Sequence, residues 1–180
     1  MWAIVKDNEI TETFSNLKGL KIDNIQYSRN ILSFRWSEAE RNAIGVYTIV
    51  SDNSNRKDDS LYTNTDVSYA FADGKVTASY GTANPKELDD VKSLKKADIK
   101  SQASGLLTPL DWHVIKATEV ESYSVPEAIT TYRADVRSTS NTMETAIDNA
   151  ADVDALAALY EYTGDPGSQT RPLGEWPEEV

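Results

Sequence analysis

Few residues of this 180-residue chain could carry out catalysis or bind a metal. Cysteine is absent, which excludes thiol nucleophiles, disulfide bonds, zinc–thiolate sites and iron–sulfur clusters. His113 is the single histidine, so any site that needs two imidazoles is excluded as well. Neither a nucleophile elbow nor a glycine-rich turn accompanies Asp111-Trp112-His113, and we expect His113 to have a structural or surface role.

The polar segment at residues 51–60 has part of the spacing of a calcium-binding loop. Asp52, Ser54 and Asp58 could supply oxygen ligands. However, Lys57 stands where such a loop needs its turn glycine, and the closing glutamate is missing. We therefore expect a polar surface loop rather than a calcium site.

A second acidic group consists of Asp148, Asp152 and Asp154, with two carboxylates about one helical turn apart. It has no partnering histidine or third ligand, which indicates a solvated helix face. No phosphate-binding loop, dinucleotide fingerprint or metalloprotease helix occurs in the chain either. The sequence therefore predicts a non-enzymatic protein with no catalytic residues, no metal and no other cofactor.

Three large side chains could instead contact a protein partner. Arg133 and Arg137 are four residues apart, beside an apolar stripe that contains Tyr132 and Val136. They either cover the edge of the core and pair with acidic residues, or they border a protein interface, where arginine is favoured. Trp176 lies in an acidic, proline-containing segment and could fill a pocket on this chain or on another.

The elements before residue 84 read as β-hairpins with one short helix. Asp7-Asn8, Asp23-Asn24 and Asp73-Gly74 are each flanked by apolar residues, and such pairs favour tight two-residue turns. Ser37-Glu38-Ala39-Glu40 is a capping box, and Gly45 stands where a short helix would end. A further extended segment is expected from the apolar residues Ile31, Leu32, Phe34 and Trp36.

The elements after residue 84 read as helices. Asn84-Pro85 predicts a helix start, and Thr108-Pro109 and Pro126 predict two more, because proline is favoured in a first helical turn. Apolar residues recur at helical spacing after each of these positions. The Ala- and Asp-rich residues 148–162 predict another helix.

The predicted fold class is α+β. Residues 1–83 form an N-terminal antiparallel β-hairpin domain with one short helix, and residues 84–162 form a helical domain of three to five helices. Residues 163–180 contain three prolines and three glycines, which predicts an extended acidic tail.

The net charge of −11 makes nucleic acid an unfavourable partner, because phosphates repel an acidic surface. Of this charge, −9 belongs to residues 121–180, which hold 12 acidic and 3 basic residues. No apolar run approaches the roughly 20 residues that span a bilayer, so no membrane partner is expected.

The order of several motifs in residues 84–180 resembles the C-terminal module of tailed-bacteriophage tail fibre assembly proteins. That module has two leucines, an Asp-Trp pair, a proline-opened helix with Tyr-Arg and a second arginine, and a closing Trp-Pro. The corresponding motifs here are Leu106-Leu107, Asp111-Trp112, Pro126, Tyr132-Arg133, Arg137 and Trp176-Pro177. The Ala- and Asp-rich segment at residues 148–162 is longer than the module has.

The resemblance implies a non-catalytic phage protein that binds a tail fibre or baseplate protein and supports fibre assembly as a chaperone. The alternative is a permanent structural or adaptor component of the virion tail, fibre or baseplate. The expected location is the host cytoplasm during assembly or the virion tail, and association with further copies of the chain stays open. Among the matched residues, we expect core roles for Trp112 and Tyr132, and partner contacts for Arg133, Arg137 and Trp176.

Overall fold

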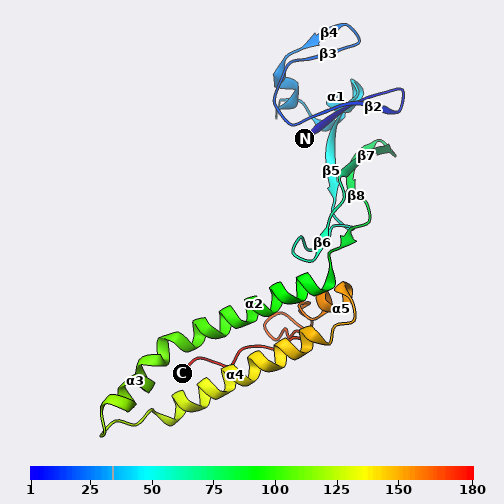
Figure 1. Ribbon diagram of the computed structural model, residues 1–180. Helices are drawn as coiled ribbons and strands as arrows, with labels where there is room; N and C mark the ends of the chain where they lie inside the picture. Colours follow the sequence, from blue (N-terminus) through cyan, green and yellow to red (C-terminus); the bar gives the residue numbers. More distant parts are fainter. Residues whose placement is uncertain (34) are drawn as a thin grey trace. The chain divides into compact units, whose positions relative to one another are not determined.

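The computed structural model describes residues 1–33 and 35–180 and divides them into two compact units, residues 1–84 and residues 85–180 (Figure 1). The first unit contains the strands and the second contains the long helices, so the protein is mixed α/β as expected. The C-terminal residues 163–180 belong to the second unit.

The principal sheet of the first unit has the strand order β2-β1-β5-β8-β7 (Figure 1). Its strands are β1 (Trp2–Lys6), β2 (Glu9–Phe14), β5 (Val46–Asp52), β7 (Val67–Ala72) and β8 (Lys75–Tyr80). The hairpins β1–β2 and β7–β8 are antiparallel, as predicted.

Strand β5 joins these two hairpins and makes the sheet mixed. Its first half pairs antiparallel with β1 from Val46 to Thr48, and its second half pairs parallel with β8 from Ile49 to Asp52. The predicted antiparallel arrangement holds within the hairpins of the domain but is wrong for the pairing of β5 with β8. The cause is that the chain runs through the loop after β5 and through β7 before it forms β8, and so returns in the same direction.

The turn prediction from acidic and amide residues is confirmed. Asp7-Asn8, Asp23-Asn24 and Asp73-Gly74 all have positive φ angles at both positions, between 47° and 70°. This is the backbone of a type I′ turn, whose twist matches that of the flanking strands. The second of these turns joins β3 (Leu20–Ile22) to β4 (Ile25–Tyr27).

The expected extended segment before the capping box is wrong: its start is helical, and Trp36 near its end lies in a bend. Arg29–Leu32 form a 3₁₀ helix, because Ser28 caps it by accepting a hydrogen bond from the Asn30 N–H. Ile31 and Leu32 are buried in a core with Phe14, Leu20 and Val46. Phe34 lies outside the described residues.

Helix α1 (Glu38–Ala43) has the predicted capping box at its start: Ser37 accepts from the Glu40 N–H, and the Glu40 carboxylate accepts from the Ser37 N–H at 2.7 Å. The hydrogen bonds that the Glu40 carboxylate accepts from the Ser37 N–H and hydroxyl hold the pKa of Glu40 below its usual value. Gly45 follows the helix with φ +79°, and its carbonyl accepts a hydrogen bond from the Val5 N–H at 2.8 Å. The chain thus passes from α1 into β5 directly against β1.

The prediction of a helix start at Asn84-Pro85 is wrong. These residues form the short strand β9, which pairs with β6 (Tyr62–Thr63), and helix α2 (Leu88–Leu107) begins three residues later, after Glu87. Proline is compatible with both an edge strand and a first helical turn, so the dipeptide does not separate the two.

The helices of the second unit are α2, α3 (Asp111–Glu119), α4 (Glu127–Asp148) and α5 (Val153–Ala158). The expected starts near Thr108-Pro109 and Pro126 are observed, the first as a 3₁₀ turn, Thr108–Leu110, that leads into α3. Figure 1 shows α2 and α4 lying side by side, with α3 at the end where they are joined.

The helix expected over residues 148–162 is shorter than predicted, and a break separates it from the helix before it. Helix α4 ends at Asp148, and the short α5 begins after Asp152, whose carboxylate accepts a hydrogen bond from the Ala155 N–H at 2.7 Å. Aspartate competes with the helical backbone in this way, and it therefore starts a new helix rather than continuing the old one.

The tail at residues 163–180 forms no helix and only the isolated bridge Thr163–Thr170, all of its residues being described. Leu173 is 3% exposed, and its N–H donates to the Leu159 carbonyl at 3.0 Å. The tail is therefore folded onto the helical unit.

We predict that Gly45→Ala destabilises the protein more than Gly74→Ala. Both glycines have a positive φ, but a Cβ at Gly45 would lie 2.5 Å from the Val5 carbonyl oxygen, whereas a Cβ at Gly74 would meet nothing within 4 Å. The expected losses in the free energy of unfolding are about 3 and about 1 kcal/mol, measured by denaturant unfolding. Equal losses would show that the contact with Val5 does not constrain this turn.

Candidate protein-interaction surface

One core cluster of the helical unit consists of Ala103, Tyr132 and Val136, on the facing sides of α2 and α4. Tyr132 is 4% exposed, so its expected core role is confirmed. Burial raises the pKa of Tyr132 above its usual value. Partly buried side chains pack on the cluster: Leu106, Leu107, Leu110 and Trp176.

Trp176 brings the tail onto this cluster. Its indole packs against the buried residues, and its Nε1–H donates to Gln102 Oε1 at 2.9 Å. Trp176 was expected to pack either on its own chain or on another. The structure shows that it packs on its own chain.

Arg133 is held by its own chain. Its Nη1 donates to the Leu107 carbonyl at 3.0 Å and lies 2.8 Å from Asp111 Oδ1, with the side chain 11% exposed. The Leu107 carbonyl lies where α2 passes into the 3₁₀ turn Thr108–Leu110, and the guanidinium supplies it with a charged donor. Arg133 thereby connects the end of α2 to the start of α3. Little of its side chain stays exposed for contact with a partner.

Arg137 is exposed on the next turn of α4. Its Nη1 donates to the Arg133 carbonyl at 3.1 Å, which fixes the side chain along the helix. It stays a candidate for a partner contact.

Trp112 is not in the core, contrary to our expectation. It is 51% exposed, and the described residues of α3 include none that is buried. The reason is the 3₁₀ turn Thr108–Leu110, which changes the phase between α2 and α3, so that Leu107 and Leu110 take the positions on the core cluster.

The aromatic side chains around α3 are ordered by one another. The rings of Trp112 and His113 lie 3.6 Å apart, and His113 Nδ1 shares a hydrogen bond with the Tyr123 hydroxyl. Lys116 Nζ lies 4.3 Å from the centre of the Tyr123 ring and 5.8 Å from that of Trp112, as cation–π contacts require. His113 thus has the structural and surface role that its sequence context predicts.

We use the name α3 surface for Trp112, Ile115 and Lys116, which share one helix face at positions i, i+3 and i+4. Ile115 is 57% exposed, more than Trp112. Two large apolar side chains thus stand in solvent next to a cation on a short helix. The sequence periodicity indicated that Trp112 is buried. It could not predict how far α3 is rotated about its own axis relative to α2.

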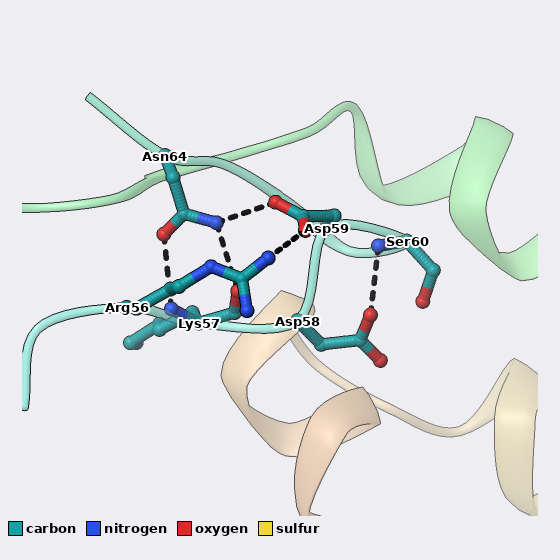
Figure 2. Close-up of polar contacts among 6 residues, drawn as sticks. All are labelled: Arg56, Lys57, Asp58, Asp59, Ser60 and Asn64. Atoms are coloured by element: carbon teal, nitrogen blue, oxygen red, sulfur yellow. Dashed lines mark hydrogen bonds and ion pairs between the residues drawn. The ribbon is translucent and has the colours of Figure 1, made fainter. Parts of the chain in front are cut away.

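The possible calcium loop of the first unit is a network of polar contacts (Figure 2). The Asp58 carboxylate accepts from the Ser60 N–H at 2.8 Å, and Asp59 contacts both Arg56 at 2.5 Å and the amide of Asn64 at 2.7 Å. Asn64 also exchanges two hydrogen bonds with the backbone of Lys57.

The remaining carboxylates of the two acidic groups also have protein partners. Asp52 accepts a hydrogen bond from the Ser54 N–H at 2.9 Å, which lowers its pKa. Asp148 pairs with Lys96 at 2.6 Å, and this contact raises the pKa of the lysine. Within residues 1–33 and 35–180, no three acidic or histidine side chains are placed to hold a metal ion.

None of the described helices combines the length and the apolarity that a bilayer crossing requires. Comparison with protein families, with curated proteins and with solved structures finds no match to this chain.

We predict that Arg133→Met lowers the free energy of unfolding by about 1–3 kcal/mol, because it removes the charged donor to the Leu107 carbonyl and the partner of the Asp111 carboxylate. Methionine keeps most of the packing of the arginine stem. The matched variant Arg137→Met, one turn further on, is expected to cost less than about 1 kcal/mol since its side chain is exposed. Denaturant unfolding of both variants measures the difference, and equal costs would contradict a structural role specific to Arg133.

Proposed function

We propose that this chain is a non-enzymatic bacteriophage tail protein that binds the tail fibre or its attachment region and supports fibre assembly. Support comes from the ordered motifs of residues 84–180 and from where their side chains lie. Tyr132, Arg133 and Trp176 build one structural unit around the core cluster, which explains why they occur together.

The observation that carries the proposal is the α3 surface. Trp112 is half exposed and lies beside the exposed Ile115, so a partner that covers them removes apolar surface from water, which favours binding. Tryptophan is also enriched among the residues that contribute most to binding energies. Stacking on His113 and the cation–π contact of Lys116 restrict the Trp112 ring before binding, which lowers the entropy lost on association. These observations support a partner contact at Trp112 and Ile115, with Arg137 as a further candidate.

The prediction is that Trp112→Ala combined with Ile115→Ala weakens binding to the tail fibre protein of the same phage by at least about 30-fold. Calorimetric titration with the purified fibre protein measures the Kd. The matched control is Leu94→Ala, since Leu94 is equally apolar and 63% exposed but lies on α2. Because the replaced side chains are exposed, circular dichroism should be unchanged. Unchanged binding by the double variant would contradict a role for the α3 surface.

A second experiment separates an assembly chaperone from a permanent tail component. Mass spectrometry of purified particles is expected to show no stoichiometric amount of the chain, and deletion of its gene is expected to remove fibres from the particles. Stoichiometric presence would overturn the chaperone and establish the structural or adaptor alternative.

A further inference from the structure

Strand β7 forms one edge of the principal sheet (Figure 1). Within the part of the chain that the structure describes, no strand is hydrogen-bonded to its outer side, and the sheet curls so that the other edge strand, β2, approaches β7. Exposed sheet edges attract other strands, so proteins usually protect them with charged side chains, prolines or bulges.

The opposite edge, β2, has such protection. It carries Glu9 and Glu12, the second of which is paired with Lys18. Its pairing with β1 also contains a bulge between Ile4 and Val5. A strand added to β2 would have to displace these charges.

Strand β7 has none of these devices. Its sequence, Val-Ser-Tyr-Ala-Phe-Ala, contains no charge and no proline, and its pairing with β8 is regular over all six positions. Tyr69 in its centre is 37% exposed.

We propose that β7 is a dimerisation strand, which pairs antiparallel with β7 of a second copy of this chain. In the register that places Tyr69 opposite Tyr69 of the second copy, Val67 lies opposite Phe71 and Ser68 opposite Ala70. Apolar residues then meet apolar residues on one face, and small residues meet on the other. Aromatic and β-branched cross-strand pairs of this kind stabilise antiparallel strands.

The charges at the ends of β7 favour this register. Asp66, directly before the strand, would lie opposite Ala72 of the second copy, and Ala72 is paired with Lys75 on β8. Lys75 and Asp66 of the two copies would then flank one alanine, about 10 Å apart at Cα, which their side chains can bridge. Neither residue forms an ion pair with another described residue, so both are available.

The symmetry of the arrangement makes a second copy the occupant. A two-fold axis through Tyr69 forms the same Asp66–Lys75 pair twice, and no like charges meet along the strand. The first unit, residues 1–83, has a net charge of only −2, compared with −11 for the whole chain, so copies meet here with the least repulsion.

Analytical ultracentrifugation of the full chain from about 1 µM to about 1 mM is expected to show a monomer–dimer equilibrium. Ser68→Lys with Ala70→Lys places lysines opposite each other twice and should raise the dimer Kd by at least about tenfold. Ser68→Glu with Ala70→Lys places opposite charges there and should keep the dimer. Both double variants lose the same Ser68 hydroxyl, which donates to the Ser79 carbonyl, so a general effect on folding would appear in both. Thr13→Lys on β2 is the control for the other edge.

The register is tested by single cysteines, since the chain has none. Tyr69→Cys should crosslink copies under mild oxidation, because directly opposed residues are about 5 Å apart at Cα, within disulfide range. Ser68→Cys should not, because residues 68 of the two copies would be about 8 Å apart. A monomer at all concentrations, or a dimer that the two lysines leave intact, would overturn the proposal. Crosslinking at Ser68 but not at Tyr69 would overturn the register.

Discussion

The helical unit depends on one interaction, the contact of the Arg133 guanidinium with the Leu107 carbonyl and the Asp111 carboxylate. It joins α4, which carries the arginine, to the end of α2 and the start of α3. The end of α2 passes into the 3₁₀ turn Thr108–Leu110, which leads into α3. Arg133 adds a charged donor and a counter-charge at this point, and so ties the turn to α4.

A comparable constraint organises the first unit. Strand β5 pairs with β1 over its first three residues and with β8 over its last four. Two hairpins are thus joined through one strand, and the close approach of Gly45 to Val5 determines where that strand begins. The edges β2 and β7 are a consequence, since the two hairpins extend from one shared strand and the curled sheet brings their outer strands near each other without hydrogen-bonding them into a ladder.

Local features were predictable from sequence because they depend on neighbouring residues. The I′ turns, the capping box before α1 and the helical character after residue 87 each follow from a few adjacent side chains. Features that depend on distant residues were not. The parallel β5–β8 pair needs a connection through β7, and the exposure of Trp112 follows from a 3₁₀ turn that rotates α3 by an amount that periodicity does not encode.

The candidate site shows the same division. Sequence motifs identified Arg133 and Trp176, but only the fold shows that both contact their own chain, whereas Trp112 does not enter the core. Two of the residues that sequence analysis singled out therefore help to build the fold of this chain. Arg133 and Trp176 stabilise the part of the helical unit next to α3. Binding is proposed at the exposed face of α3.

Charge restricts the chemistry of the proposed partner. Residues 121–180 have a net charge of −9, and Lys116 is the only basic residue of α3. Because Lys116 lies over the rings of Trp112 and Tyr123, its charge stays close to the apolar surface instead of neutralising the acidic residues further along the unit. A partner that covers Trp112 and Ile115 therefore approaches through a negative potential, which accelerates association with a basic surface and slows it with an acidic one. The proposed fibre contact should accordingly be apolar at its centre and basic at its rim.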